Sequence, residues 1–112
     1  MIVRIARATR TGKSAFIQSI ALCAGSGSSV FKEIKRDVDV LFTGELSHHE
    51  VLAATERGTH VILCGHTNTE RGFLKILKKD LQSHLDKMVG PQTTEVCVST
   101  KDHDPIETWV HT

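Results

Sequence analysis

Short apolar runs alternate along the chain with longer segments of mixed polarity. Three continuous apolar runs, at residues 18–24, 38–42 and 59–64, are typical of strands that are buried on both faces. Residues 2–8 alternate loosely between apolar and basic side chains, which predicts a half-exposed strand at a sheet edge. A last strand is predicted at residues 93–99.

Amphipathic segments between these runs predict three helices, at residues 27–35, 47–57 and 68–87. The longest carries an apolar stripe typical of a helix packed on a sheet, formed by Phe73, Leu77, Leu81 and Leu85. Alternating strands and helices favour right-handed βαβ units. We therefore predict an α/β fold, with a mostly parallel sheet and helices on both faces.

The polar connection at residues 9–16 is predicted to be a solvated hairpin that turns at Gly12. Its Gly12-Lys13-Ser14 sequence resembles the end of a nucleotide-binding P-loop. The glycine required five residues earlier is replaced by Arg7, so the backbone cradle that would hold a phosphate is missing. We therefore expect no nucleotide site at this connection.

A glycine-rich turn, Gly25-Ser26-Gly27, joins the first buried strand to the following helix. Backbone amides in such a turn could bind a phosphate or carboxylate. The alternative is tight strand-to-helix packing, with Ser26 or Ser28 capping the helix. The turn lacks the third glycine of a dinucleotide fingerprint, so a dinucleotide is not expected.

Polar residues follow the second buried strand, at the end where ligands bind in open parallel sheets. Glu45 and His48 are the candidate catalytic or substrate-contacting residues there, with plain surface placement as the alternative for His48. The adjacent His49 would point about 100° away from His48 on a helix, so only one of them can face the site. Ser47 and Glu50 form a capping box, which accounts for Glu50 without chemistry.

The segment Gly65–Gly72 combines a histidine and a carboxylate at the third strand end. His66 and Glu70 lie four residues apart, so their side chains can converge on one point and bind a divalent metal. Thr67 and Glu70 also match a capping box, with Thr67 as the N-cap. Both interpretations of Glu70 remain open from the sequence.

Composition narrows the classes of partner. The 112 residues suffice for one domain that buries roughly two-thirds of its unfolded surface. Fourteen basic against thirteen acidic residues give no general attraction to nucleic acid or anionic membrane. Four Phe, one Trp and no Tyr supply no set of stacking residues for single-stranded nucleic acid. We therefore expect neither nucleic acid nor membrane as a partner.

Three cysteines, Cys23, Cys64 and Cys97, lie in apolar runs without Cys-x-x-Cys spacing. We interpret them as buried thiols and not as a zinc ribbon or redox pair. Their odd number, together with a sequence lacking a signal peptide or a bilayer-spanning run, predicts a cytoplasmic protein.

Three motifs in order resemble the C-terminal part of the Nif-three-like family: Ile20–Val30 (IALCAGSGSSV), Thr43–Val51 (TGELSHHEV) and Gly65–Phe73 (GHTNTERGF). The tail Lys101–Trp109 is similar to the family's terminal Asp-Pro segment. Members are also described as homologues of GTP cyclohydrolase I type two. The resemblance covers nearly the whole chain but not the family's long N-terminal portion, which carries further histidine and aspartate ligands. Met1 therefore lies where a family member would be in mid-chain.

The resemblance implies a metal-associated protein whose His66 and Glu70 belong to a two-metal centre for zinc, manganese or iron. These two ligands alone would make an incomplete site, so we expect the chain by itself to be inactive. It also implies a homo-oligomer, because family members assemble into rings. The alternative is a non-catalytic interaction or scaffold module of the transcription-cofactor-binding type.

Overall fold

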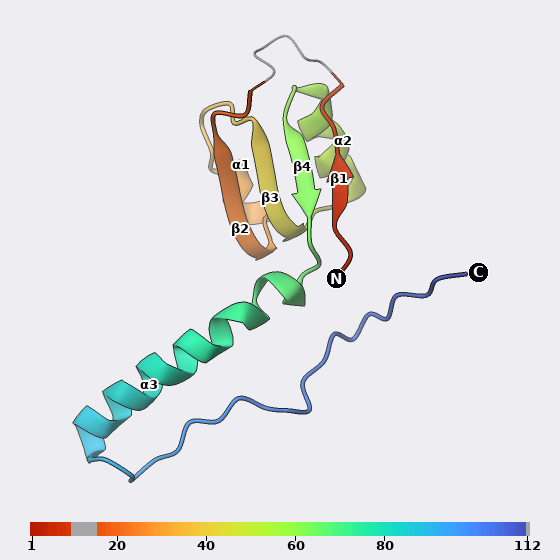
Figure 1. The fold of residues 1–112 in the computed structure, drawn as a ribbon. Coiled ribbons are helices and arrows are strands. Elements are labelled where there is room, and N and C mark those ends of the chain that lie inside the picture. Colours follow the sequence, from red (N-terminus) through yellow and green to blue (C-terminus); the bar gives the residue numbers. More distant parts are fainter. Residues whose placement is uncertain (10–15, 112) are drawn as a thin grey trace. The chain divides into compact units, whose positions relative to one another are not determined.

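The computed structural model describes residues 1–9 and 16–111 (Figure 1). It divides into two units, and the first, Met1–Arg71, is built on a four-stranded sheet. Length alone predicts one domain, whereas the chain divides by its contacts into this unit and Gly72–Thr112. The predicted hairpin turn with Gly12-Lys13-Ser14 lies outside the described residues.

The sheet confirms the predicted edge strand and the three apolar strands. Its strands are β1 (Arg4–Ala6), β2 (Ile20–Ser26), β3 (Val40–Glu45) and β4 (His60–Leu63), in the order β1-β4-β3-β2. Strands β2, β3 and β4 are parallel, and β1 pairs antiparallel with β4 at the edge. The three parallel strands therefore end at the same edge of the sheet.

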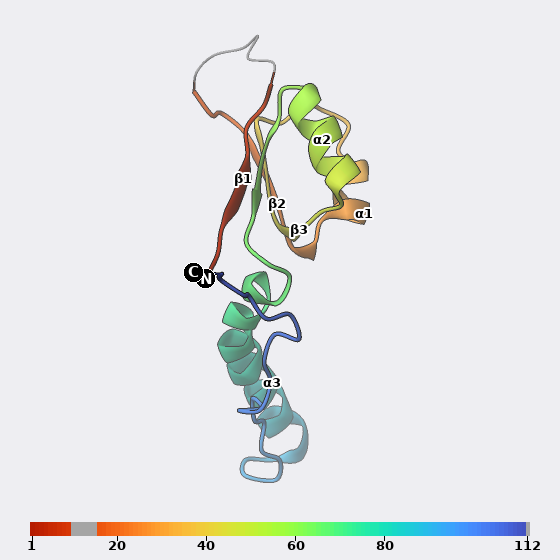
Figure 2. The same ribbon diagram turned by 90° about the vertical axis from the view of Figure 1, so that its right-hand side faces the viewer.

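Helices α1 (Ser28–Lys32) and α2 (His48–Glu56) lie on the same face of this sheet (Figure 2). The sequence predicts helices on both faces, and within this unit that detail is wrong. Strands β2, β3 and β4 follow one another in space in chain order, so two right-handed crossovers in the same direction place both helices on one side.

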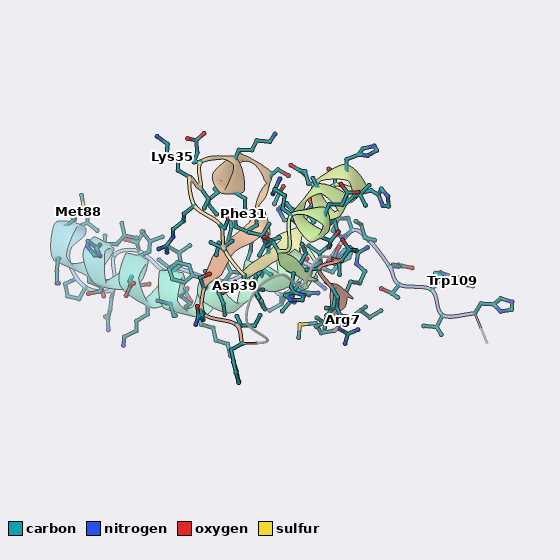
Figure 3. All side chains as sticks on the ribbon, turned by 90° about the horizontal axis from the view of Figure 1, so that it is seen from above. Arg7, Phe31, Lys35, Asp39, Met88 and Trp109 are labelled. Carbon is teal, nitrogen blue, oxygen red and sulfur yellow. The ribbon has the colours of Figure 1, made fainter. Side chains whose placement is uncertain are left out.

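The core of the unit lies between the two helices and the sheet. Leu41 and Val61, on neighbouring strands, pack with Leu63 and with Ala54 of α2. Phe31 packs from α1 against this cluster (Figure 3). Side chains that alternate with Leu41 and Val61 along the strands therefore point to the opposite face.

That opposite face carries an apolar row, which we call the open-face row: Leu22, Phe42, Ile62 and Ile5. The pairing register joins Leu22 to Phe42, Phe42 to Ile62, and Ile62 to Ile5, so the row crosses all four strands. Leu22 is 74% exposed, Ile5 59% and Phe42 39%. An apolar surface that spans a sheet and stays in contact with water is typical of an interaction site.

In the second unit, α3 (Leu74–Val89) begins six residues later than the predicted helix at 68–87. Two 3-10 turns, Thr67–Thr69 and Arg71–Phe73, occupy the positions before it. The predicted strand at 93–99 is wrong. The Gln82 side chain accepts from the Val96 amide and donates to the Thr94 carbonyl, so helix-to-segment bonds replace strand pairing there. No helix in residues 1–9 or 16–111 is both long and apolar enough to cross a bilayer.

Candidate metal site

The carboxyl ends of β2, β3 and β4 are held together by hydrogen bonds. The buried Thr43 hydroxyl donates to the Gly25 carbonyl at 3.1 Å, which links β3 to the end of β2. The Gly65 amide donates to the Gly44 carbonyl at 2.9 Å, which links the ends of β4 and β3. The predicted convergence of the three strand ends is confirmed.

His66 lies at this edge between two carboxylates from different elements. Its Nδ1 is 2.8 Å from Glu45 Oε1 at the end of β3, and its Nε2 is 3.5 Å from Glu70 Oε1 after the first 3-10 turn. All three side chains are between 43% and 51% exposed. The expectation that His66 and Glu70 lie within a few ångströms of each other, open to solvent, is therefore confirmed.

The two ring nitrogens of His66 make different contacts in this geometry. A carboxylate can only accept, so Glu45 fixes the tautomer in which Nδ1 carries the proton and donates. When the ring is neutral, its Nε2 carries the lone pair, and this nitrogen faces the Glu70 carboxylate. Two electron-pair donors that face each other attract a cation, either a proton on Nε2 or a metal ion.

The donor set at this edge fits part of a metal shell and not a complete one. Glu45 and Glu70 lie on opposite nitrogens of the same ring, so both cannot meet one ion together with His66. Across residues 1–9 and 16–111, no three His, Cys, Asp or Glu side chains are grouped to hold a metal. Of these side chains, Glu70 faces His66 Nε2 and Glu45 is bonded to His66 Nδ1, so that metal binding by His66 and Glu70 stays a prediction.

The capping-box interpretation of Glu70 is wrong. The residue before the first 3-10 turn is His66, with no side-chain cap bond, and α3 is preceded by Phe73, also without one. The Thr67 hydroxyl instead accepts from Arg71 Nη1 at 2.9 Å. Glu70 is therefore not used as the partner of a Thr67 N-cap.

Thr69 holds this turn in place, and sequence reasoning missed it. Its hydroxyl donates to the His66 carbonyl at 2.7 Å and accepts from the Gly25 amide at 2.8 Å. It joins the His66 segment to the end of β2. The only signal in the sequence is its place between His66 and Glu70, within the motif that carries both candidate ligands.

The Gly25-Ser26-Gly27 turn lies directly against the site. A Cβ on Gly25, whose φ is +67°, would lie 2.6 Å from Glu70 Oε1 and 3.1 Å from His66 Nε2. The Gly25 amide is bonded to Thr69, and the Gly27 amide donates to the Glu45 carbonyl at 3.4 Å. Both amides therefore already donate hydrogen bonds to acceptors within the protein. Anion binding by the turn stays a prediction.

His48, the other candidate catalytic residue, is the first residue of α2 and is exposed. Its ring meets that of His49 edge-on, with 5.8 Å between centroids. It lines a shallow hollow together with Ile5 and Leu63. Its role as a substrate-contacting group stays a prediction.

Glu50 closes the predicted capping box and also ties α1 to α2. The Ser47 amide donates to its carboxylate at 2.9 Å, the Ser28 hydroxyl at 2.8 Å, and the Glu50 amide donates to the Ser47 hydroxyl. Neither Ser26 nor Ser28 caps α1, because Gly27 is its N-cap. The backbone bond from Ser47, followed by the Ser28 hydroxyl, holds the pKa of Glu50 below its ordinary value.

Glu50→Gln is expected to destabilise the protein at neutral pH but not in acid. A depressed pKa means that the ionised carboxylate stabilises the fold above the unfolded-state pKa of about 4.3, and this stabilisation is lost as pH falls through the lower folded pKa. Chemical unfolding from pH 3 to 7 should show parent and mutant converging at the acid end. Glu56→Gln, at the exposed end of α2, is the matched control, and a constant difference at every pH would contradict the prediction.

Residues 2–105 match the family model described as Duf34/NIF3 (NGG1p interacting factor 3). The chain is 51% identical over 90 residues to NGG1-interacting factor 3 of Saccharomyces cerevisiae, which covers 80% of this chain and 29% of that protein. It is 45% identical over 91 residues to NIF3-like protein 1 of Homo sapiens, covering 81% of this chain and 22% of that protein. The chain thus spans less than a third of the length of either relative.

Among solved structures, the fold is similar to that of the Staphylococcus aureus protein SA1388. The TM-score is 0.69 at 27% sequence identity, with 96% of this chain and 33% of that chain covered. The three motifs at the carboxyl ends of the strands all lie inside the residues that the family model matches. The chain belongs to the Duf34/NIF3 family.

Proposed function

We propose that this chain supplies the C-terminal half-site of a metal-dependent hydrolase centre of the GTP cyclohydrolase I type two class. The observation that supports the proposal is the geometry of His66, whose Nδ1 is held by Glu45 while Nε2 faces Glu70 at 3.5 Å. The resemblance of the motifs to GTP cyclohydrolase homologues points to the same chemistry.

In this proposal, His66 Nε2 and Glu70 bind a divalent ion of zinc, manganese or iron. When bound, such an ion activates a water for attack and stabilises the negative charge that develops. Glu45 keeps the proton on Nδ1, so that Nε2 remains the donor toward the ion. The remaining ligands must come from outside the pair, because two donors are fewer than the three protein ligands of catalytic zinc sites.

His66→Ala is expected to weaken zinc or manganese binding by about tenfold or more, because it removes one of two donors. Calorimetric titration of the purified chain measures this change. His84→Ala, whose Nδ1 contacts the Asp80 carbonyl on α3, is the matched control and should bind metal like the parent. Equal affinities in parent and His66→Ala would contradict the proposed half-site.

The same proteins should release no formate from GTP above the rate without protein, since an incomplete shell does not activate water efficiently. Formate is measured after incubation with GTP and manganese. Robust release by the 112-residue chain, lost in His66→Ala, would show that the chain alone is a complete enzyme and would contradict this expectation.

A second candidate function is a non-catalytic interaction module. The open-face row of Leu22, Phe42, Ile62 and Ile5 favours it, because such a surface needs a partner. The name of the yeast relative, NGG1-interacting factor 3, describes that protein by an interaction. We propose that the first partner of this surface is a second copy of the chain.

Leu22→Glu is expected to convert a self-associated protein into a monomer, since it places a charge at the β2 end of the apolar row, on its most exposed leucine. Light scattering at micromolar concentration measures the mass. Leu52→Glu changes an exposed leucine on α2, on the helix-covered face, and should keep the mass of the parent. A monomeric parent that binds no hydrophobic dye would sink the self-association proposal.

We propose that the protein works in the cytoplasm, and its three free cysteines support this, because thiols stay reduced in that compartment. The interpretation of all three as buried thiols is wrong in part. Cys64 is buried, Cys23 is half-buried, and Cys97 is exposed in the segment after α3 that does not form the predicted strand.

A further inference from the structure

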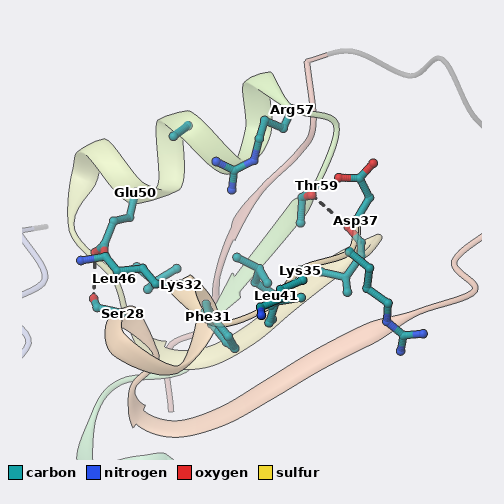
Figure 4. Close-up of a pocket in the computed structure, with 14 residues that line it drawn as sticks. Ser28, Phe31, Lys32, Lys35, Asp37, Leu41, Leu46, Glu50, Arg57 and Thr59 are labelled. Atoms are coloured by element: carbon teal, nitrogen blue, oxygen red, sulfur yellow. Dashed lines mark hydrogen bonds between the residues drawn. The ribbon is translucent and has the colours of Figure 1, made fainter.

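A groove separates α1 and α2 on the helix-covered face of the sheet, with β3 at its base (Figure 4). Its volume is about 430 Å³. The lining runs from Ser28 and Glu50, at the beginnings of the two helices, to Arg57 and Thr59, between α2 and β4. We call it the interhelical groove.

The floor of the interhelical groove is apolar. Half-buried side chains from both helices and from the segments flanking β3 surround the buried Leu41: Phe31, Ile34, Val38, Leu46 and Ala53. All of them line the same groove. A partner that inserts apolar side chains would therefore find a preformed surface to bury them on.

The rim of the groove is predominantly basic. Four cationic side chains stand against two carboxylates: Lys32, Lys35, Arg36 and Arg57 against Asp37 and Glu50. Glu50 is already bonded to Ser28 and Ser47, so its charge is partly satisfied within the protein. The chain as a whole has a net charge of only +1, so this concentration of positive charge is a local feature.

The groove is elongated. Helix α2 has nine residues, which at about 1.5 Å per residue gives a length of roughly 13 Å. That length accommodates about four residues of an extended peptide or more than two turns of a helix. The apolar floor then meets anchoring side chains along the peptide, and the rim meets acidic residues beside them.

We propose that the interhelical groove binds an acidic amphipathic peptide segment of a partner protein. Apolar anchors on the floor provide the binding energy, and carboxylates opposite the lysines and arginines set orientation and association rate. The site is separate from the His66 half-site, since the two share no lining residue. It also goes beyond the metal chemistry, because its occupant is a protein segment.

The probe is a fluorescein-labelled synthetic peptide in which leucine and phenylalanine alternate with aspartate and glutamate, measured by anisotropy. We expect saturable binding that weakens as salt rises. The double variant Lys35→Glu, Arg57→Glu should bind about tenfold or more weakly, because it reverses two rim charges. The double variant Lys78→Glu, Lys79→Glu, two exposed changes on α3, is the charge-matched control and should bind like the parent.

A second variant tests the floor without changing charge. Ala53→Leu fills the groove from α2 and should also weaken binding by about tenfold, while circular dichroism checks that it folds. Amide shifts of the unaltered chain on titration with the peptide should cluster at the groove. The proposal would be overturned if a peptide with lysine in place of every acid bound equally well. It would also be overturned if the amide shifts were located elsewhere, or if octanoate bound saturably while the peptide did not bind at all.

Discussion

Gly44→Ala is expected to destabilise the protein by about 1–3 kcal/mol, as overpacking of a tight interior does. A Cβ at this position would lie 2.5 Å from the Gly25 carbonyl oxygen, 2.8 Å from the Gly65 carbonyl oxygen and 2.8 Å from the His66 Cα. All three are backbone atoms on neighbouring segments, so no side-chain rotation relieves the contact. The strand ends would have to separate.

Chemical denaturation at neutral pH measures the loss in the free energy of unfolding. Gly72→Ala is the matched control, because a Cβ there meets no atom within 4 Å. The Gly44 mutant should also bind metal less tightly, since the segments that carry Glu45 and His66 are those forced apart. A Gly44→Ala protein with the stability of the parent would show that the three strand ends are not packed as described.

The convergence of the site could be predicted from the sequence because it follows from topology. Parallel strands with short apolar runs end at one sheet edge, so Gly25, Glu45 and His66 had to meet there. The role of Glu45 could not be predicted in the same way. It depends on which nitrogen of His66 the carboxylate reaches, and that distance of 2.8 Å is set by side-chain conformation.

The start of the last helix shows where local patterns fail. Thr67 and Glu70 match a capping box by spacing alone. The Thr69 hydroxyl, however, accepts from the Gly25 amide and donates to the His66 carbonyl. The contact with Gly25 joins residues 44 positions apart, so no local pattern contains it. The segment consequently forms 3-10 turns, and α3 begins only at Leu74.

Residues 93–99 match the pattern of a strand for a related reason. Alternating Val96 and Val98 satisfy the period of a strand, but a strand also needs a neighbour for its amides and carbonyls. Here the Gln82 side chain supplies both a donor and an acceptor to the segment, at 2.9 Å each. The hydrogen bonds of Gln82, on the preceding helix, thus determine the conformation of this segment, which the apolar pattern alone does not predict.

Glu70→Gln is expected to weaken zinc or manganese binding by about tenfold or more, which corresponds to roughly 1.4 kcal/mol, while leaving thermal stability nearly unchanged. The carboxylate faces His66 Nε2 at 3.5 Å and caps no helix, so in the proposed half-site its charge serves the cation and not the fold. Calorimetric titration measures the affinity, and thermal melts in chelator measure the stability.

Glu45→Gln tests whether Glu45 binds the metal itself or only orients His66. Glutamine keeps a side-chain oxygen that can accept from His66 Nδ1, so the tautomer is retained and the loss of affinity should be smaller than for Glu70→Gln. Glu107→Gln, an exposed carboxylate in the C-terminal segment, controls for the change in net charge and should bind metal like the parent. If Glu70→Gln and the parent bind metal equally and only the mutant melts earlier, Glu70 is a structural residue and the half-site does not exist. If Glu45→Gln causes the larger loss, the ligand is Glu45 and the ion lies on the Nδ1 side of His66, which would reverse the assignment of its two nitrogens.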